Sequence, residues 1–189
     1  MNTWEIIGAA LGLISVWLTV RQNIWCWPTG LVMVALYAVV FFQAKLYADA
    51  GLQLVYIGLQ IYGWYEWLHG GKDQGRLEVT RITLRLGLAL GVIAAVATAL
   101  MGYTLATKTD AALPYWDSAA TVLSLVAQWM LAKKIIENWL VWITVDVLSI
   151  GIYTAKGLYP TTVLYTAFLL MATLGWIEWR KTLSSLQTA

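Results

Sequence analysis

Polar side chains recur at helical spacing inside long apolar stretches of this sequence, where they could bind a polar molecule away from bulk water. Residues three and four positions apart lie on one face of an α-helix, so each set forms one polar face. The three sets are Asp49, Gln53, Tyr56 and Gln60; Asp117, Thr121, Ser124 and Gln128; and Trp139, Trp142, Asp146, Ser149 and Tyr153. Together they offer carboxylates, amides, hydroxyls and indole rings that could line one cavity.

Asp146 is the most informative of these residues, because it lies near the middle of its apolar stretch. An aspartate at that depth in a bilayer costs roughly 2.5–3.5 kcal/mol on insertion scales. Three interpretations are open: a buried ion pair, a protonated and hydrogen-bonded carboxyl, and a hydrated site that accepts a cation. Every Lys and Arg lies in a loop or near the end of a stretch, which favours the cation site. Trp139 and Trp142 share this helix face and could offer their indole rings to the same cation.

The elements that carry these residues are expected to be membrane-spanning helices. Hydrophobic residues make up 60% of the 189 residues and charged residues only 12%, whereas an average soluble domain is about 25% charged. A soluble domain of this size could not bury so much apolar surface. Seven apolar stretches have about the length of a bilayer crossing. They are 3–20, 24–42, 46–68, 84–104, 114–132, 138–154 and 158–179. The sequence therefore predicts an all-α membrane protein of seven transmembrane helices in one domain, residues 1–189.

The composition also excludes several classes of protein. The single cysteine, Cys26, and the single histidine, His69, exclude a disulfide framework and a metal site built from several Cys or His residues. No Gly-rich nucleotide loop and no Ser/His/Asp arrangement occurs in the sequence, so we expect no cofactor and no enzymatic activity. A net charge of +2 argues against a nucleic-acid partner.

Basic residues and tryptophans predict how the chain sits in the membrane. If the N-terminus is outside, nine of the 12 Lys and Arg residues are cytoplasmic, and only Lys45, Lys108 and Lys156 are outside. The positive-inside rule therefore predicts an outer N-terminus and a cytoplasmic C-terminus. Six tryptophans at stretch ends are expected to lie in the interfacial aromatic belts. They are Trp4, Trp25, Trp64, Trp67, Trp176 and Trp179.

The two ends of the chain form an internal repeat. When the chain is shifted by 112 residues, so that Trp27 falls on Trp139, many residues of the two ends coincide without a gap. The coincident pairs are Trp4-Glu5 with Trp116-Asp117, Trp17 with Trp129, Arg21 with Lys133, Leu46-Tyr47 with Leu158-Tyr159, Gly63-Trp64 with Gly175-Trp176, and Glu66-Trp67 with Glu178-Trp179. We therefore predict a first three-helix repeat over about 3–68 and a second over about 114–179. A linking helix over about 84–104 gives both repeats the same orientation, as in SWEET-type transporters.

Two groups of motifs carry a resemblance to a known family. Phe42-Gln43-Ala44-Lys45-Leu46-Tyr47-Ala48 followed by Ile61-Tyr62-Gly63-Trp64-Tyr65 resembles the first repeat of the PnuC family of vitamin transporters. Tyr115-Trp116-Asp117-Ser118, Glu137-Asn138-Trp139-Leu140-Val141-Trp142 and Lys156-Gly157-Leu158-Tyr159 resemble its second repeat. The similarity covers essentially the whole chain in order.

The resemblance implies a SWEET-like fold of three, one and three helices, assembled as a homotrimer in the bacterial inner membrane. It also implies facilitated diffusion of nicotinamide riboside, which cytoplasmic phosphorylation then traps. Thiamine is the alternative substrate, because related members carry it and it is also a flat aromatic cation. Gln60 and Asp146 stand where some riboside-transporting members have asparagine, which leaves this choice open.

The residues expected to contact the substrate follow from the resemblance and from the polar faces. Trp139 and Trp142 are expected to stack on the pyridinium ring, and Asp146 to compensate its charge. The residues expected to hydrogen-bond the amide or the ribose are Gln53, Tyr56, Gln60, Asn138 and Ser149.

Overall fold

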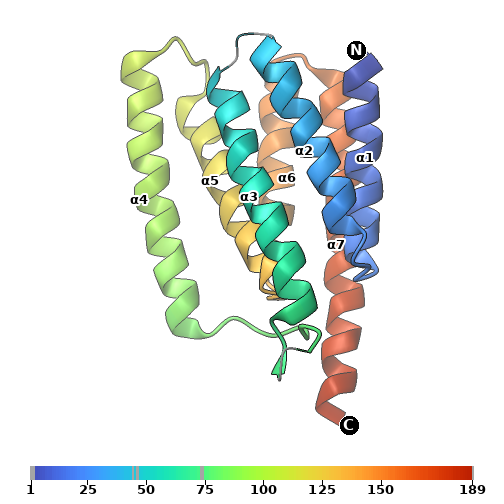
Figure 1. Ribbon diagram of the computed structural model, residues 1–189. Helices are drawn as coiled ribbons and strands as arrows, with labels where there is room; N and C mark the ends of the chain where they lie inside the picture. Colours follow the sequence, from blue (N-terminus) through green and yellow to red (C-terminus); the bar gives the residue numbers. More distant parts are fainter. Residues whose placement is uncertain (1–2, 44, 46, 73–74, 189) are drawn as a thin grey trace.

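The computed structural model describes residues 3–43, 45, 47–72 and 75–188, and these residues form seven α-helices. The helices are α1 (Thr3–Val20), α2 (Cys26–Gln43), α3 (Tyr47–His69), α4 (Leu84–Lys108), α5 (Pro114–Ala132), α6 (Asn138–Ala155) and α7 (Tyr159–Thr188). They run alternately up and down, so that the two termini lie at opposite ends of the bundle (Figure 1). The predicted all-helical fold is confirmed.

The helix bounds agree closely with the apolar stretches. α1 and α5 begin and end at the predicted residues, and α5 starts with Pro114, whose fixed φ suits the first turn of a helix. Residue 46, the predicted start of the third stretch, lies outside the described residues. The largest difference is at α7, which continues past Trp179 to Thr188. That extension is polar, so the apolar pattern ends before the helix does.

Six of the helices form a closed arrangement, here called the helix ring. α1 packs on α2, α2 on α3, α3 on α5, α5 on α6, α6 on α7, and α7 packs back on α1. α4 stands outside the ring beside α5 (Figure 1). Near one end of the bundle Gly102 of α4 leaves room for the Tyr115 ring of α5. The linking helix is therefore the peripheral element of the fold.

The helices differ in how apolar they are. By length and composition α2, α4, α6 and α7 each suffice to cross a membrane, and α1 contributes a shorter apolar segment, Ile6–Val20. α3 and α5 carry polar residues along their length, including Gln53 and Gln60 on α3 and Gln128 on α5. These two helices pack on each other within the ring. A polar region of the helix ring therefore lies where α3 meets α5.

Equivalent positions of the two chain ends adopt equivalent backbone conformations. Gln22 and Lys134, which are 112 residues apart, both have positive φ, 53° and 49°. Lys45 and Gly157 are separated by the same interval and have φ values of 60° and 70°. Each of these residues lies in the short turn between two helices of its half. The shared turn geometry supports the predicted repeat.

Four buried tryptophans hold the two chain ends together at one end of the bundle. Trp27 meets Trp67 edge to face with centroids 5.3 Å apart, and Trp139 meets Trp179 in the same way at 5.4 Å. Trp67 and Trp179 then contact each other at 5.9 Å. The four side chains are at most 3% exposed.

The predicted belt position is wrong for Trp67 and Trp179. The Trp67 indole N–H donates to the Leu131 carbonyl at 3.1 Å, and the Trp179 indole N–H donates to the Thr19 carbonyl at 3.2 Å. Each indole N–H thus has a partner at the end of a helix in the other half, a carbonyl that also accepts a backbone N–H of the following turn. Trp4 and Trp25, by contrast, are 54% and 64% exposed, as expected for belt residues.

The loop between α3 and α4 is attached to the turn between α5 and α6. Thr80 and Ile135 form a short parallel bridge, with Thr80 N–H donating to the Lys134 carbonyl at 3.0 Å and Ile136 N–H donating to the Thr80 carbonyl at 2.9 Å. The buried Lys134 ammonium donates to the Leu77 carbonyl at 2.9 Å and lies 4.4 Å from the centroid of the Trp67 ring. One lysine therefore joins a loop, a turn and the tryptophan cluster.

Lys134 is expected to make stability depend on pH. Burial lowers the pKa of this amine from 10.5 to about 8. Between these two values the unfolded chain binds a proton that the folded chain lacks, so stability rises with pH by at most about 1.4 kcal/mol per pH unit. Lys134→Met should remove that dependence from the thermal unfolding midpoint measured between pH 7.5 and 10.

Lys133 provides the matched control, because it is the neighbouring lysine in a different setting. Its ammonium forms an ion pair with Glu66 at 3.1 Å, and the hydrogen bond to Tyr62 is the main reason that its pKa is raised. Lys133→Met should keep the wild-type increase in stability between pH 8 and 10. An unchanged pH slope in Lys134→Met would contradict the assignment.

Candidate functional site

Asp146 lies at the middle of α6 and is 3% exposed. Within the described part of the chain no Lys or Arg forms an ion pair with it, and no hydrogen bond to its carboxylate is found. The sequence accounts for this, because no helix carries a Lys or Arg in its central turns. A buried ion pair, one of the three open interpretations, is thus not formed among the described residues.

Tyr165 of α7 is where residues of three helices converge. Its ring stacks on Tyr153 of α6 with 5.2 Å between the ring centroids. Tyr165 also lies close enough to Asp146 and to Tyr56 of α3 to interact with them electrostatically. α3 is not a main packing partner of α6 or α7, and it meets α7 in the tryptophan cluster, where Trp67 contacts Trp179. These side chains therefore approach one another across the interior of the helix ring.

The predicted α3 residues point to two different neighbours. The Tyr56 hydroxyl is hydrogen-bonded to the Ser124 hydroxyl of α5, and Ser124 in turn donates to the Thr121 carbonyl at 2.8 Å. The Gln60 amide lies against Gly30 of α2, where an added Cβ would come within 2.6 Å of its Nε2. Gln53, one turn from Tyr56, is half-buried. Tyr56 thus belongs to the group around Tyr165, and Gln60 lies one turn further along α3.

The predicted α6 residues divide into two groups. Ser149 is buried and lies one turn beyond Asp146 on the same helix face. Trp142, one turn before Asp146, is half-buried and packs on the tryptophan cluster. Asn138 and Trp139 lie at the start of α6 and are almost fully buried.

The start of α6 holds buried polar atoms without a partner. Asn138 donates from Nδ2 to the Ile135 carbonyl at 2.7 Å, but its Oδ1 has no hydrogen bond among the described residues. The indole N–H of Trp139 is also unpaired there. One face of the Trp139 ring packs on Gly175, and its edge contacts Trp179. The structure thus places these two residues in the tryptophan cluster, about 11 Å along the helix from Asp146 by the helical rise.

The polar group is asymmetric between the two halves. The positions 112 residues before Thr121, Ser124 and Gln128 hold Ala9, Gly12 and Val16. The position equivalent to Asp146 is Val34, which is buried on α2. Gly12 is itself packed against Met33 and Phe168, so that side of the ring interior is apolar. The halves share their turns and tryptophans and differ where a ligand could bind.

Tyr165 was missed from the sequence, because it lies in a mostly apolar stretch. The repeat could have found it, since Tyr165 is equivalent to Gln53, a residue that was selected. Tyr153 was recognised on the α6 face but was not placed among the substrate contacts.

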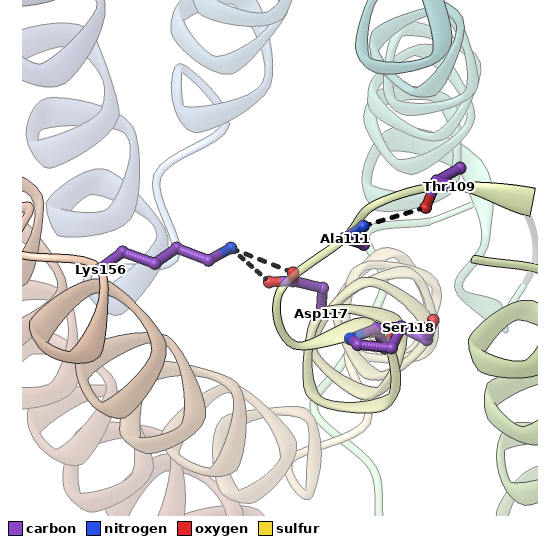
Figure 2. Close-up of polar contacts among 6 residues, drawn as sticks. Thr109, Ala111, Asp117, Ser118 and Lys156 are labelled. Atoms are coloured by element: carbon purple, nitrogen blue, oxygen red, sulfur yellow. Dashed lines mark hydrogen bonds and ion pairs between the residues drawn. The ribbon is translucent and has the colours of Figure 1, made fainter. Parts of the chain in front are cut away.

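Asp117 and Asp49 lie away from the central group. Both carboxylate oxygens of Asp117 pair with the Lys156 ammonium, at Nζ to oxygen distances of 3.0 and 3.1 Å (Figure 2). This ion pair lies at the end of the bundle where α5 begins and α6 ends. Figure 2 also shows the Ala111 N–H donating to the Thr109 hydroxyl in the preceding connection. Asp49 is exposed near the start of α3. Of the three aspartates Asp49, Asp117 and Asp146, it is therefore Asp146 that lies near the centre of its helix.

Neither of two hollows on the described part of the molecule is lined by the eight predicted contact residues. One lies along the end of α7, and the other lies between α5 and α6 against Trp116 and Gly151. Within the group around Asp146 and Tyr165, the Tyr56 and Ser124 hydroxyls are already hydrogen-bonded to each other.

Comparison with known proteins identifies the family. Residues 2–181 match the family described as nicotinamide mononucleotide transporter. The chain belongs to the nicotinamide mononucleotide transporter family. The nicotinamide riboside transporter PnuC of Escherichia coli (strain K12) is 28% identical over 200 residues, covering 93% of this chain and 84% of that protein. The riboflavin/roseoflavin transporter RibM of Streptomyces davaonensis is also 28% identical, covering 93% of this chain and 83% of that protein.

A solved structure supports the same assignment. The crystal structure of the vitamin B3 transporter PnuC matches with a TM-score of 0.75 and 26% identity, covering 95% of this chain and 81% of that chain. The resemblance noted in the sequence is thereby confirmed. Members of the nicotinamide mononucleotide transporter family are transporters and not enzymes, so this chain is a multi-pass transporter of the bacterial inner membrane.

Proposed function

We propose that this chain carries nicotinamide riboside across the bacterial inner membrane by facilitated diffusion. The observation that carries the proposal is the buried, unpaired carboxylate of Asp146 at the middle of α6. Nicotinamide riboside has a pyridinium cation, a carboxamide and a ribose. The pyridinium cation would compensate the negative charge of Asp146, which has no ion pair among the described residues. The amides and hydroxyls around Asp146 would bind the carboxamide and the ribose.

Nicotinamide riboside fits this helix bundle better than nicotinamide mononucleotide, the substrate in the description of the family. A phosphate carried through the membrane requires a cation near mid-depth, because a buried anion without one is strongly unfavourable. The central turns of the helices hold no Lys or Arg. We also propose a passive mechanism, in which phosphorylation on the cytoplasmic side would trap the riboside after transport.

The substrate contacts are proposed as a path along α6 and α3. Asp146 and Ser149, together with Tyr56, Gln53 and the added Tyr165, would form the central group. Gln60 and Trp142 would lie one turn further toward the tryptophan cluster, and Asn138 and Trp139 at its end. The unpaired Asn138 Oδ1 and Trp139 N–H would then contact a substrate after Trp139 moves away from Gly175. Opening of this packed end is thus part of the proposal.

We further propose the membrane orientation and the assembly. The N-terminus would lie outside and the C-terminus in the cytoplasm, so that the tryptophan cluster and Lys134 close the cytoplasmic end. The two three-helix repeats would be related by an axis along the membrane normal, with α4 as the link. The functional unit would be a homotrimer.

Titration of the purified protein with several ligands in parallel tests the substrate. We expect nicotinamide riboside to bind at least tenfold more tightly than nicotinamide mononucleotide, since a buried unpaired phosphate costs more than about 1.4 kcal/mol. Thiamine is the second candidate, because it also carries an aromatic cation. Riboflavin, the ligand in the name of the relative RibM, is neutral and would leave Asp146 without a counter-charge. Tighter binding of thiamine or riboflavin than of the riboside would overturn the proposal.

A further inference from the structure

The far end of α7 carries a hollow that the transport proposal does not use. This hollow, here called the α7 hollow, has a volume of about 480 Å³. Its lining residues are Trp176, Ile177, Arg180, Lys181 and Ser184. The buried α7 residues Ala172, Trp179 and Leu183 lie on a different face of the helix, which packs on the ring. The α7 hollow is therefore on the outer flank of the bundle.

Hydrogen bonds fix the depth of the α7 hollow relative to the neighbouring helix. The Trp179 N–H donates to the Thr19 carbonyl in the last turn of α1, and Gln22, just beyond the end of α1, donates from Nε2 to the Thr182 hydroxyl at 3.1 Å. Arg180 and Lys181 lie between these two levels along α7. They are thus at the height where α1 ends and the chain turns, which is where a bilayer-spanning helix meets the headgroups.

The lining of the α7 hollow changes from apolar to basic toward the C-terminal end of α7, which is the end that leaves the membrane. Trp176 and Ile177 come first along α7 and belong to the apolar part of the helix, whereas Arg180 and Lys181 follow one turn later and are exposed. A phospholipid presents the same order, because its acyl chains and glycerol lie deeper than its phosphate. Tryptophan is the residue that most favours this interfacial level.

The charges at this level favour an anion. The Lys181 ammonium is paired with Glu178 at 2.8 Å, whereas Arg180 has no ion pair to a carboxylate within residues that the structure describes. Arg21, which contacts the Trp17 ring, also acts electrostatically on Glu178. Lys181 and Arg21 therefore both act on the Glu178 carboxylate, and Arg180 adds a further positive charge to the hollow. A planar guanidinium is well suited to bind phosphate oxygens in pairs.

We propose that the α7 hollow binds the headgroup of an anionic phospholipid, with the phosphate on Arg180 and Lys181 and the glycerol region against Trp176 and Ile177. Basic pockets at the membrane surface bind acidic headgroups through this chemistry. The site is separate from the transport path, so its occupancy does not depend on which vitamin is carried.

Native mass spectrometry of the full-length protein tests the α7 hollow, with phosphatidylglycerol and phosphatidylcholine as the probes. The wild type should retain phosphatidylglycerol in preference to phosphatidylcholine. The double variant Arg180→Gln/Lys181→Gln should bind phosphatidylglycerol roughly tenfold more weakly, given the contribution of each cation near an anionic headgroup. Arg180→Lys should keep most of the binding, because it preserves the charge.

Arg81→Gln/Arg85→Gln is the matched control. These two arginines are also exposed and lie beside the start of α4, at the same end of the bundle, but outside the α7 hollow. The control should bind phosphatidylglycerol within about twofold of the wild type, since charge effects fade beyond a Debye length. Equal retention of the two lipids by the wild type, equal losses in both double variants, or full displacement of the lipid by millimolar inorganic phosphate would each overturn the proposal.

Discussion

Asp146→Asn is expected to weaken the binding of nicotinamide riboside by about 10- to 100-fold, while a neutral analogue of the same shape loses less than about threefold. The substitution removes one charge and leaves the size of the side chain almost unchanged. Close charge pairs that are shielded from water couple by about 1.5 kcal/mol or more, and each 1.4 kcal/mol is a factor of ten in the dissociation constant. Calorimetric titration of the purified protein, with the riboside and with an analogue whose ring nitrogen is replaced by carbon, measures both losses.

Asp49→Asn is the control for this experiment. It makes the same chemical change on α3, but at an exposed position near the helix start, away from the group around Tyr165. Its effect on either ligand should stay within about twofold. Similar losses for the cation and for the neutral analogue in Asp146→Asn would remove the carboxylate from charge compensation. Asp146 would then be a structural group of the packed interior.

Much of the fold could be predicted because bilayer-crossing helices are encoded locally. A helix in lipid must satisfy its own backbone hydrogen bonds, so apolar runs of suitable length give its bounds directly. Pro114 marks the start of α5, and Gly157 with its positive φ marks the turn after α6. The end of α7 was misplaced, since the polar residues after Trp179 continue a helix outside the apolar pattern.

The contacts between helices were not predictable from periodicity. Trp67 and Trp179 have the sequence signature of interfacial residues, and only the approach of the opposite half buries their N–H groups against carbonyls at helix ends. The attachment of Thr80 to the turn at Ile135 depends likewise on two loops that are distant in sequence. For the site, helical spacing selected Tyr56 and Asp146 as members of polar faces, but Tyr165, which lies near both, is in a mostly apolar stretch.

Gly63→Ala and Gly175→Ala are expected to destabilise the protein by similar amounts, about 1–3 kcal/mol each. A Cβ at Gly63 would lie 2.1 Å from Cη2 of Trp27, and a Cβ at Gly175 would lie 2.5 Å from the ring atoms of Trp139. Both indoles are rigid and at most 2% exposed, so neither has room to move, and adding volume to a packed core costs about this much. Thermal unfolding in detergent, followed by tryptophan fluorescence, measures the loss.

Gly58→Ala separates this clash from a general effect of alanine. Gly58 is on the same helix as Gly63 and has no atom within 4 Å of the added Cβ. Alanine there should be neutral or stabilising by up to about 1 kcal/mol, because glycine weakens a helix interior. If Gly58→Ala destabilised the protein as much as Gly63→Ala, the loss would come from alanine in this helix and not from a clash with the Trp27 ring.

The two glycine variants should differ in substrate binding even though their effects on stability agree. Trp139 is a proposed substrate contact on the helix that carries Asp146, whereas its equivalent Trp27 lies on α2, where the position equivalent to Asp146 is the apolar Val34. Gly175→Ala should therefore lower the affinity of the folded protein for the riboside, and Gly63→Ala should leave it unchanged. A loss of stability confined to one variant would argue against equivalent halves. Unchanged affinity in Gly175→Ala would instead restrict Trp139 to the structural role that Trp27 has.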